Sequence, residues 1–183
     1  MSSPHATLRL EPAVVTHVFL DGNVTRHPES HFLDLVIGDR SLRSIAGERA
    51  RDLVTELNRP WLREVPDAVD RFLGRRSAEF LGPGRIPLLV CAVDGDLGCG
   101  QLTAAVRVAA DVTWSDFMWE DGSAQPSPAG LLDGSVRFDR AQYEATFAEA
   151  YERVAAFPYD ERAHRGRRFL WPWQWGWKLP RDD

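Results

Sequence analysis

The segment from Ile86 to Val93 is the most apolar stretch of the chain, and it constrains the fold more than any other feature. A short apolar run without polar alternation is typical of a strand that is buried on both faces of its sheet. We therefore expect this strand to lie centrally in a sheet. Residues 101–108 and 112–119 favour a β-hairpin that follows it, joined by residues 109–111.

Other patterns along the chain predict further strands and helices. Strands are expected at residues 7–10, 14–20, 24–27 and 32–37, with a hairpin turn at residues 21–23; helices are expected at residues 46–57, 66–73 and from Asp139 to about residue 157. Strands precede helices without regular alternation, which predicts an α+β fold: an antiparallel or mixed sheet with helices packed on one face. Residues 1–161 are expected to form a single domain, and residues 162–183 an Arg/Trp-rich tail that docks on it.

The charge balance excludes one class of partner. The chain has 22 basic and 27 acidic side chains and a net charge of −5, so it is acidic, and we expect no binding of duplex nucleic acid. No apolar run approaches the roughly 20 residues of a membrane-spanning helix, and the first ten residues do not resemble a secretory signal. With only two cysteines, these features favour a soluble protein of the cytoplasm.

A turn rich in glycine and cysteine follows the apolar strand and allows three interpretations. Cys91, Asp94 and Cys99 could bind a metal such as zinc. Alternatively, one thiol could be a nucleophile or redox centre activated by a histidine, for which the candidates are His17, His27, His31 and His164. The favoured interpretation is structural: Cys91 is a core residue, and Asp94 and Asp96 accept hydrogen bonds from turn amides. No cofactor is therefore expected, and no metal site is favoured.

Three motifs in residues 91–143 carry a resemblance. Residues 95–100 have the sequence GDLGCG, residues 114–119 the sequence WSDFMW, and residues 138–143 the sequence FDRAQY. Together they resemble a group of uncharacterised bacterial proteins that have a C-x-x-C-G-D-L-G-C-G signature. Asp94 replaces the second cysteine of that signature, which argues against a shared thiolate–metal role. The group has no established activity, so the resemblance implies no mechanism.

The segment around Asp116 is a candidate catalytic region. In a regular strand Trp114 and Asp116 share one face, while Phe117 and Trp119 share the other. A carboxylate beside an indole in an apolar pocket would have a raised pKa and could act as a general acid or base. The structural alternative is an aspartate at the rim of a sheet. The candidate catalytic residues are Asp116, Cys91, Cys99 and Asp96.

The tail carries four tryptophans at alternate positions after a basic segment that includes Arg168. An extended chain would place all four indoles on one side. They could close the protein's own sheet, which is favoured, form a platform for a partner, or attach to an anionic membrane or single-stranded nucleic acid. A salt-insensitive loss of stability on deleting residues from Arg168 onward would indicate the first.

Two functions remain open after this reasoning, and whether the protein is an enzyme is undecided. The first is a non-catalytic domain that binds another protein, as an immunity or regulatory protein does. The second is an enzyme or binder of small molecules with a tryptophan-lined pocket, in which Asp116 and the cysteines are the polar groups. The candidate binding residues are Trp114, Trp119, Trp171, Trp173, Trp175, Trp177 and Arg168.

Overall fold

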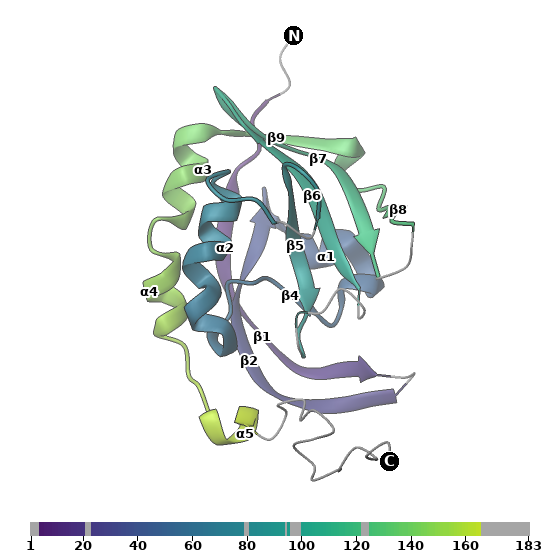
Figure 1. Ribbon diagram of the computed structural model, residues 1–183, viewed down its shortest axis with the longest axis vertical. Coiled ribbons are helices and arrows are strands. Elements are labelled where there is room, and N and C mark those ends of the chain that lie inside the picture. Colours follow the sequence, from purple (N-terminus) through teal and green to yellow (C-terminus); the bar gives the residue numbers. More distant parts are fainter. Residues whose placement is uncertain are drawn as a thin grey trace, which may run out of the picture.

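The computed structural model describes residues 4–20, 23–78, 81–93, 95, 100–121 and 125–165 of the 183-residue chain. These residues form two antiparallel sheets and several short helices, which confirms the predicted α+β fold (Figure 1). The first sheet has the strand order β1 (Leu8–Leu20), β2 (Asn23–Ile37), β3 (Arg40–Ser41). The second has the order β4 (Leu53–Val54), β5 (Arg85–Cys91), β6 (Gln101–Val108), β7 (Asp111–Glu120), β8 (Ser127–Pro128), and β9 (Ser135–Asp139) also pairs with β7.

The predicted hairpin near the start of the chain is present as the long strands β1 and β2. Leu8 lies opposite Ile37 at its base, and the regular pairing is interrupted around Thr16 in β1 and Pro28 in β2. We call the part beyond this irregularity, residues 15–20 and 23–30, the hairpin arm. Figure 1 shows the arm running along one end of the molecule, away from the six-stranded sheet.

β5 is buried on both faces, as its apolar sequence predicts. One face contributes to the main hydrophobic core with residues such as Ile86 and Leu89. The other face contributes Val90 to a smaller cluster with Val15 and Phe32 of the first sheet. The two sheets are thus joined through side chains on opposite faces of one strand.

β7 contains an irregularity that the sequence does not reveal. Ser115 pairs with Ala105 and Met118 pairs with Thr103, so β7 has one extra residue at this point. Asp116 absorbs the insertion with φ of 50°, a left-handed conformation that aspartate tolerates better than most residues. Beyond the bulge the alternation of faces is reversed, which changes where the aromatic side chains of the WSDFMW motif point.

The helices lie mainly along one side of the sheets, where Figure 1 shows α2, α3 and α4 stacked beside one another. The helical elements are α1 (Leu42–Ala46), η1 (Gly47–Ala50), η2 (Arg59–Glu64), α2 (Val65–Phe72), η4 (Leu132–Gly134), α3 (Arg140–Phe147), α4 (Ala150–Ala155) and α5 (Glu161–Arg165). The predicted helix at 66–73 is confirmed as α2. The helix predicted from Asp139 is present as α3 and α4, and Phe72, Tyr143, Phe147 and Val154 are buried from this side.

The prediction of one helix over residues 46–57 is wrong. α1 ends at Ala46, because Gly47 adopts φ of 74°, and a single 3-10 turn follows. Leu53 and Val54 then form β4, which pairs with Cys91 and Val90 at the edge of β5. Leu53 enters the main core and Val54 the smaller cluster, so the apolar spacing that resembles one helical stripe serves two faces of a sheet.

The edge of β1 is covered near its start by α3 and α4. Gln142 donates from Nε2 to the Leu8 carbonyl at 2.6 Å and accepts from the Leu8 amide at 3.3 Å. Arg153 donates to the Leu10 carbonyl at 2.8 Å. Asp139 caps α3 by accepting from the Gln142 amide, while the Gln142 side chain is bonded to β1.

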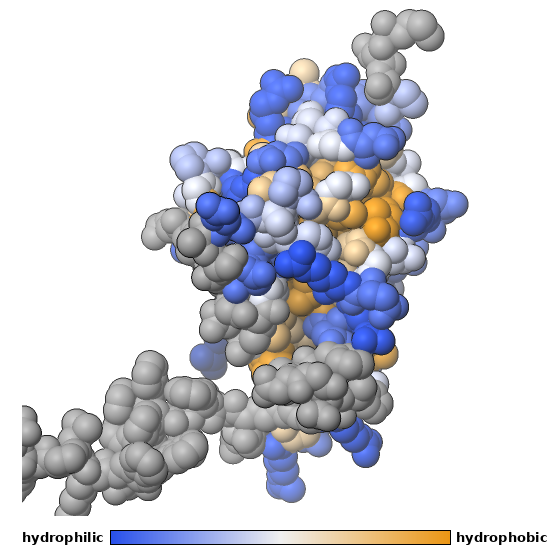
Figure 2. Space-filling view, turned by 90° about the vertical axis from the view of Figure 1, so that its right-hand side faces the viewer, coloured by the Kyte–Doolittle hydropathy of each residue, from blue (hydrophilic) through white to orange (hydrophobic). Residues whose placement is uncertain are grey.

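The surface on the side of β7 and β8 is mixed in character. Figure 2 shows hydrophobic residues reaching the surface there, bordered by strongly hydrophilic side chains. Apolar atoms make up a large share of the surface of any folded protein. Among the described residues, no helix combines the length and the apolar character that crossing a membrane requires.

Candidate binding site beside the hairpin arm

A large cleft lies between the hairpin arm and the segment that follows α4. Its volume is about 700 Å³. The described residues that line it are Thr16, Arg26, Pro28, Glu29, His31, Pro158, Tyr159, Asp160, Ala163 and His164. Thr16 and Pro28 are the residues at which the pairing of β1 and β2 becomes irregular, so the change of register helps to form this cleft. We call it the arm cleft.

One rim of the arm cleft is a stack of aromatic and cationic side chains. The ring of Tyr159 lies 4.8 Å from that of His164, and the guanidinium of Arg59 lies 4.9 Å from the centre of the Tyr159 ring. Arg59 also donates to the Phe157 carbonyl, and His164 Nδ1 lies 2.9 Å from the Asp160 carbonyl oxygen. Tyr159 is nevertheless 36% exposed, so an ordered aromatic surface faces solvent.

The opposite wall carries His31 on β2. Its ring lies 5.9 Å from that of Phe157, and its Nε2 lies 3.4 Å from a carboxylate oxygen of Glu29. Nε2 is shielded from solvent and makes no hydrogen bond with a described residue. The contact with Glu29 becomes an ion pair only when the imidazole is protonated. The cleft thus holds two histidines, His31 and His164, that are far apart in the sequence.

The hairpin arm offers backbone groups as well as side chains. Its two strands pair with each other and with no other strand in the described part of the chain. Val14, which directly precedes the arm in β1, is 46% exposed. A partner chain can add a strand to the edge of a sheet through the amide and carbonyl groups of that edge. At the base of the hairpin, α3 and α4 cover the β1 edge at Leu8 and Leu10.

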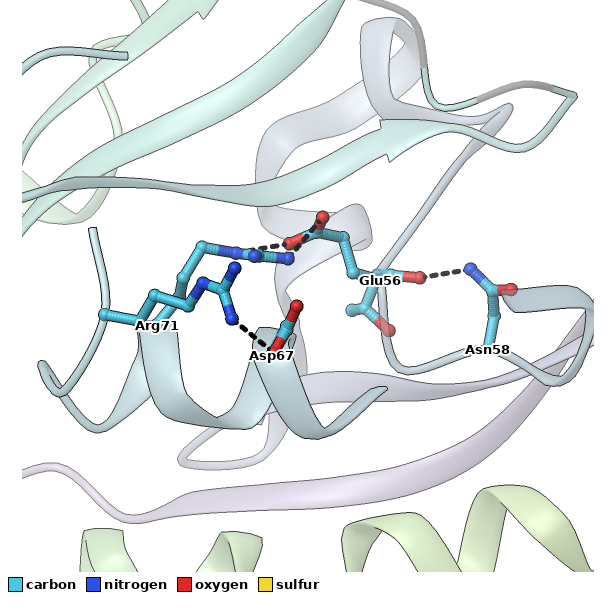
Figure 3. A network of polar contacts seen from close by, with 6 residues as sticks. Glu56, Asn58, Asp67 and Arg71 are labelled. Atoms are coloured by element: carbon cyan, nitrogen blue, oxygen red, sulfur yellow. Dashed lines mark hydrogen bonds and ion pairs between the residues drawn. The ribbon is translucent and has the colours of Figure 1, made fainter. Parts of the chain in front are cut away.

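A second polar cluster holds the region beside the cysteine–glycine turn. Arg71 of α2 makes two hydrogen bonds with Glu56, at 2.7 and 3.2 Å (Figure 3). The two side chains are only 12% and 19% exposed, and burial raises the pKa of Glu56 while the Arg71 guanidinium opposes that shift. Asn58 donates to the Thr55 carbonyl and accepts from the amide of Trp61, which fixes the start of η2.

This cluster positions Trp61 against the turn. A Cβ atom on Gly95 would lie 3.3 Å from the Trp61 ring, so the indole packs closely on the glycine. A cavity of about 370 Å³ opens here, lined among the described residues by Glu56, Trp61, Glu64, Val90 and Gly95. Glycine at this position therefore serves a close approach of backbone and indole, as well as its φ of 70°.

The candidate catalytic residue Asp116 does not lie in an apolar pocket. Its side chain is 62% exposed and forms an ion pair with Arg85, which also donates to the Asp116 carbonyl at 3.0 Å. The bulge turns Asp116 away from the indoles that a regular strand would place beside it. The hypothesis of an indole neighbour in an apolar pocket is therefore wrong, and Asp116 instead pairs with Arg85, which also donates to the buried hydroxyl of Thr103.

The two tryptophans of β7 lie in the core. Trp114 is completely buried, and its Nε1 donates to the Tyr143 hydroxyl at 3.1 Å. Trp119 is also buried, and the guanidinium of Arg49 lies 4.8 Å from the centre of its ring. Because of the bulge, Phe117 is buried together with both of them. As binding residues Trp114 and Trp119 are therefore poorly placed, since neither offers its ring to a partner.

The remaining candidates divide between buried and undescribed positions. Cys91 is buried at the end of β5, consistent with its structural interpretation. The other candidates lie outside the described residues: Asp94, Asp96, Cys99, Arg168, Trp171, Trp173, Trp175 and Trp177. The metal, thiol and tail interpretations therefore stay predictions. Within the described ranges, no group of three or more histidine, cysteine, aspartate or glutamate side chains could hold a metal ion.

Comparison of the chain with protein-family models, curated proteins and solved structures gave no match. His31 and His164 were candidates from the sequence, but as histidines that could activate a cysteine and not as residues of one cleft. The rim residues Tyr159 and Arg59 were not identified, because the two residues are far apart in the sequence and only the fold brings them together. A Pro-Tyr-Asp run after a helix is too common a pattern to indicate a site.

Proposed function

We propose that the protein is a non-catalytic domain that binds another protein, and that the arm cleft holds an extended segment of that partner. The observation that carries this proposal is the open cleft of about 700 Å³ beside a two-stranded arm that pairs with no other described strand. A segment lying there can hydrogen-bond to the strand edge while its side chains enter the cleft. An immunity protein or a regulatory partner would work in this way.

The side chains of the cleft suit recognition of a protein. Tyrosine and arginine are enriched at the residues that dominate binding energy, and Tyr159 with Arg59 forms such a pair at the rim. Glu29 and Asp160 add carboxylates, and the whole chain carries a net charge of −5. A basic partner would therefore associate faster through electrostatic steering than a neutral one.

The alternative of an enzyme with a tryptophan-lined pocket loses support from the burial of Trp114 and Trp119. A ring enclosed in the core cannot contact a substrate without unfolding of its surroundings. The exposed position of Asp116 also removes the apolar environment that a general acid or base of this kind would need. These observations favour protein binding.

Site-directed photo-crosslinking tests the proposal. A photoreactive phenylalanine derivative replaces Tyr159 in cells that express the protein, and the same derivative replaces Tyr151 as a matched control. Both tyrosines are exposed, at 36% and 44%, but Tyr151 lies on α4 outside the arm cleft. We expect one protein to be crosslinked from position 159 and not from position 151.

The crosslinked protein is then purified and its affinity for the Tyr159→Ala and Tyr151→Ala variants is measured. Loss of a binding hot spot costs at least about 2 kcal/mol, which corresponds to roughly thirtyfold weaker binding for Tyr159→Ala. Tyr151→Ala should bind as the wild type does. Equal crosslinking at both positions, or a crosslink from position 159 only to this chain itself, would refute the proposal.

A further inference from the structure

We propose that a cavity beside the C-terminal end of α2 binds a small molecule that carries a phosphate group. The cavity lies between the loop after α2, the start of β5 and the end of β6, and has a volume of about 330 Å³. It is separate from the arm cleft, with which it shares no lining residue. The described residues that line it are Arg71, Gly74, Arg75, Arg76, Ser77, Gly84, Arg85, Ile86, Val106, Arg107 and Val108.

The charge of this lining has one sign. Arg71, Arg75, Arg76, Arg85 and Arg107 contribute to it, and none of the described lining residues is acidic. This concentration is unusual in a chain whose net charge is −5. The planar guanidinium donates two parallel hydrogen bonds to a phosphate, so arginine is the side chain best suited to such a ligand.

Two of the five arginines are fixed by the protein itself. Arg71 makes its paired hydrogen bonds with Glu56. Arg85 donates to Thr103 at 2.8 Å and forms an ion pair with Asp116. These contacts hold the two side chains in place at the borders of the cavity and neutralise much of their charge, so the ligand must be bound by the others.

The other three arginines are available to a ligand. Arg75 lies 3.7 Å from Asp70 and Arg76 lies 2.6 Å from Asp67, and all four side chains are at least 45% exposed. Exposed pairs of this kind contribute about 0–1 kcal/mol, so an incoming phosphate can replace either carboxylate. Arg107 makes no ion pair with a described carboxylate, and it is exposed near the end of strand β6.

The C-terminal end of a helix carries a partial negative charge that repels an anion, but hydrogen bonds at the end of α2 reduce this repulsion. The Asp70 carbonyl accepts from the amides of both Arg75 and Arg76, and the Arg71 carbonyl accepts from the Gly74 amide. The last carbonyls of the helix are thus capped by the chain as it folds back. A Cβ on Gly74 would lie 2.9 Å from Cγ2 of Val108, so only glycine allows this loop to approach β6 so closely.

The size and the apolar part of the lining restrict the ligand further. A volume of about 330 Å³ lies at the small end of ligand-binding cavities. Ile86, Val106 and Val108 supply the apolar part of the lining. A phosphate ester of a short carbon skeleton fits both features, with its phosphate on the guanidinium groups and its carbon atoms on the valines.

Isothermal titration of the full-length protein with glycerol phosphate and with inorganic pyrophosphate tests this inference. Sodium sulfate at equal ionic strength serves as the anion control, since exposed charges are screened by salt. We expect saturable binding of one phosphate-bearing molecule per chain. Losing a hydrogen bond to a charged group weakens binding by about tenfold or more, so the double variant Arg75→Gln, Arg76→Gln should bind far more weakly than the wild type.

Arg40→Gln is the matched control variant, because Arg40 is also exposed but lies on β3 in the other sheet. It should bind as the wild type does. Circular dichroism and thermal unfolding confirm that each variant is folded before the titration. Absence of saturable binding to the wild type, equal binding of sulfate, or unchanged affinity in the double variant would overturn the inference without bearing on the arm cleft, whose residues all remain intact.

Discussion

Removing one buried hydroxyl group should destabilise the protein strongly. Tyr143 on α3 is completely buried, and its hydroxyl joins two elements that are distant in the sequence. It donates to the carbonyl of Phe72 at the end of α2, at 3.0 Å, and accepts from Trp114 Nε1 on β7, at 3.1 Å. Its ring also meets Phe138 and Phe147 at centroid distances of 5.5 and 5.2 Å.

The substitution Tyr143→Phe keeps the ring and removes only the oxygen. The indole N–H of Trp114 and the carbonyl of Phe72 then lose this partner inside the core. Each buried polar group without a partner costs about 1–3 kcal/mol, so with two such groups the free energy of unfolding should fall by about 2–6 kcal/mol. That is a large fraction of the total stability of a domain of this size, which is of the order of 5–15 kcal/mol.

The same substitution should also change how stability depends on pH. Burial raises the pKa of Tyr143 well above its value in the unfolded chain, which is 10.0. Between these two values the unfolded chain has lost the phenolic proton and the folded protein has kept it. The wild type should therefore lose about 1.4 kcal/mol of stability for each pH unit above 10, and Tyr143→Phe should lack this contribution.

Urea denaturation at neutral pH and above pH 10 measures both effects. Tyr151→Phe is the matched control, because its side chain is 44% exposed and its loss should change stability by no more than about 0.5 kcal/mol. The difference between the wild type and Tyr143→Phe should narrow as the pH rises above 10. A variant as stable as the wild type at neutral pH, or a difference that does not change with pH, would show that this core is not arranged as described.

Three further substitutions test other parts of the fold. Gln142→Ala removes both hydrogen bonds to Leu8 and should lower the free energy of unfolding by about 1–2 kcal/mol in urea denaturation, with faster hydrogen exchange at the edge of β1. Gly74→Ala forces a Cβ to within 2.9 Å of Val108 and a side chain into φ of 67°, and should lower the melting temperature by an amount equivalent to about 2–4 kcal/mol. Burial raises the pKa of Asp34, so the folded state binds that proton more tightly than the unfolded chain does. As the pH rises above 3.8, the wild type should therefore lose stability relative to Asp34→Asn, measured as the difference in unfolding free energy.

Most strands could be predicted from the sequence because their patterns are local. The apolar run at residues 86–93 predicts a buried strand, and the alternation in residues 101–119 predicts the hairpin beside it. The sequence of residues 46–57 does not distinguish one long helix from the observed short helical turns and strand. Apolar residues at intervals of three and four positions fit both. Pairing of Leu53 and Val54 with β5 decides the outcome, and that contact is not local.

The bulge in β7 shows a second limit of sequence reasoning. Nothing in residues 114–119 indicates that an extra residue will be accommodated at Asp116, yet that single insertion moves Phe117 and Trp119 to the face of Trp114. The predicted catalytic environment of Asp116 depended on regular alternation and fails with it. In the same way, the arginine-lined cavity collects residues from α2, β5 and β6, and no spacing in the sequence indicates that these arginines meet.

The binding role of the arm cleft remains the central claim, and hydrogen exchange of the protein with its crosslinked partner tests it most directly. We expect the backbone amides along one outer edge of the arm, either those of residues 15–20 in β1 or those of residues 23–30 in β2 apart from Pro28, to exchange more slowly in the complex, because a strand added to that edge would protect them. The amides of α2 and β6 should exchange at unchanged rates. Protection confined to those two elements, with the arm unaffected, would contradict the claim.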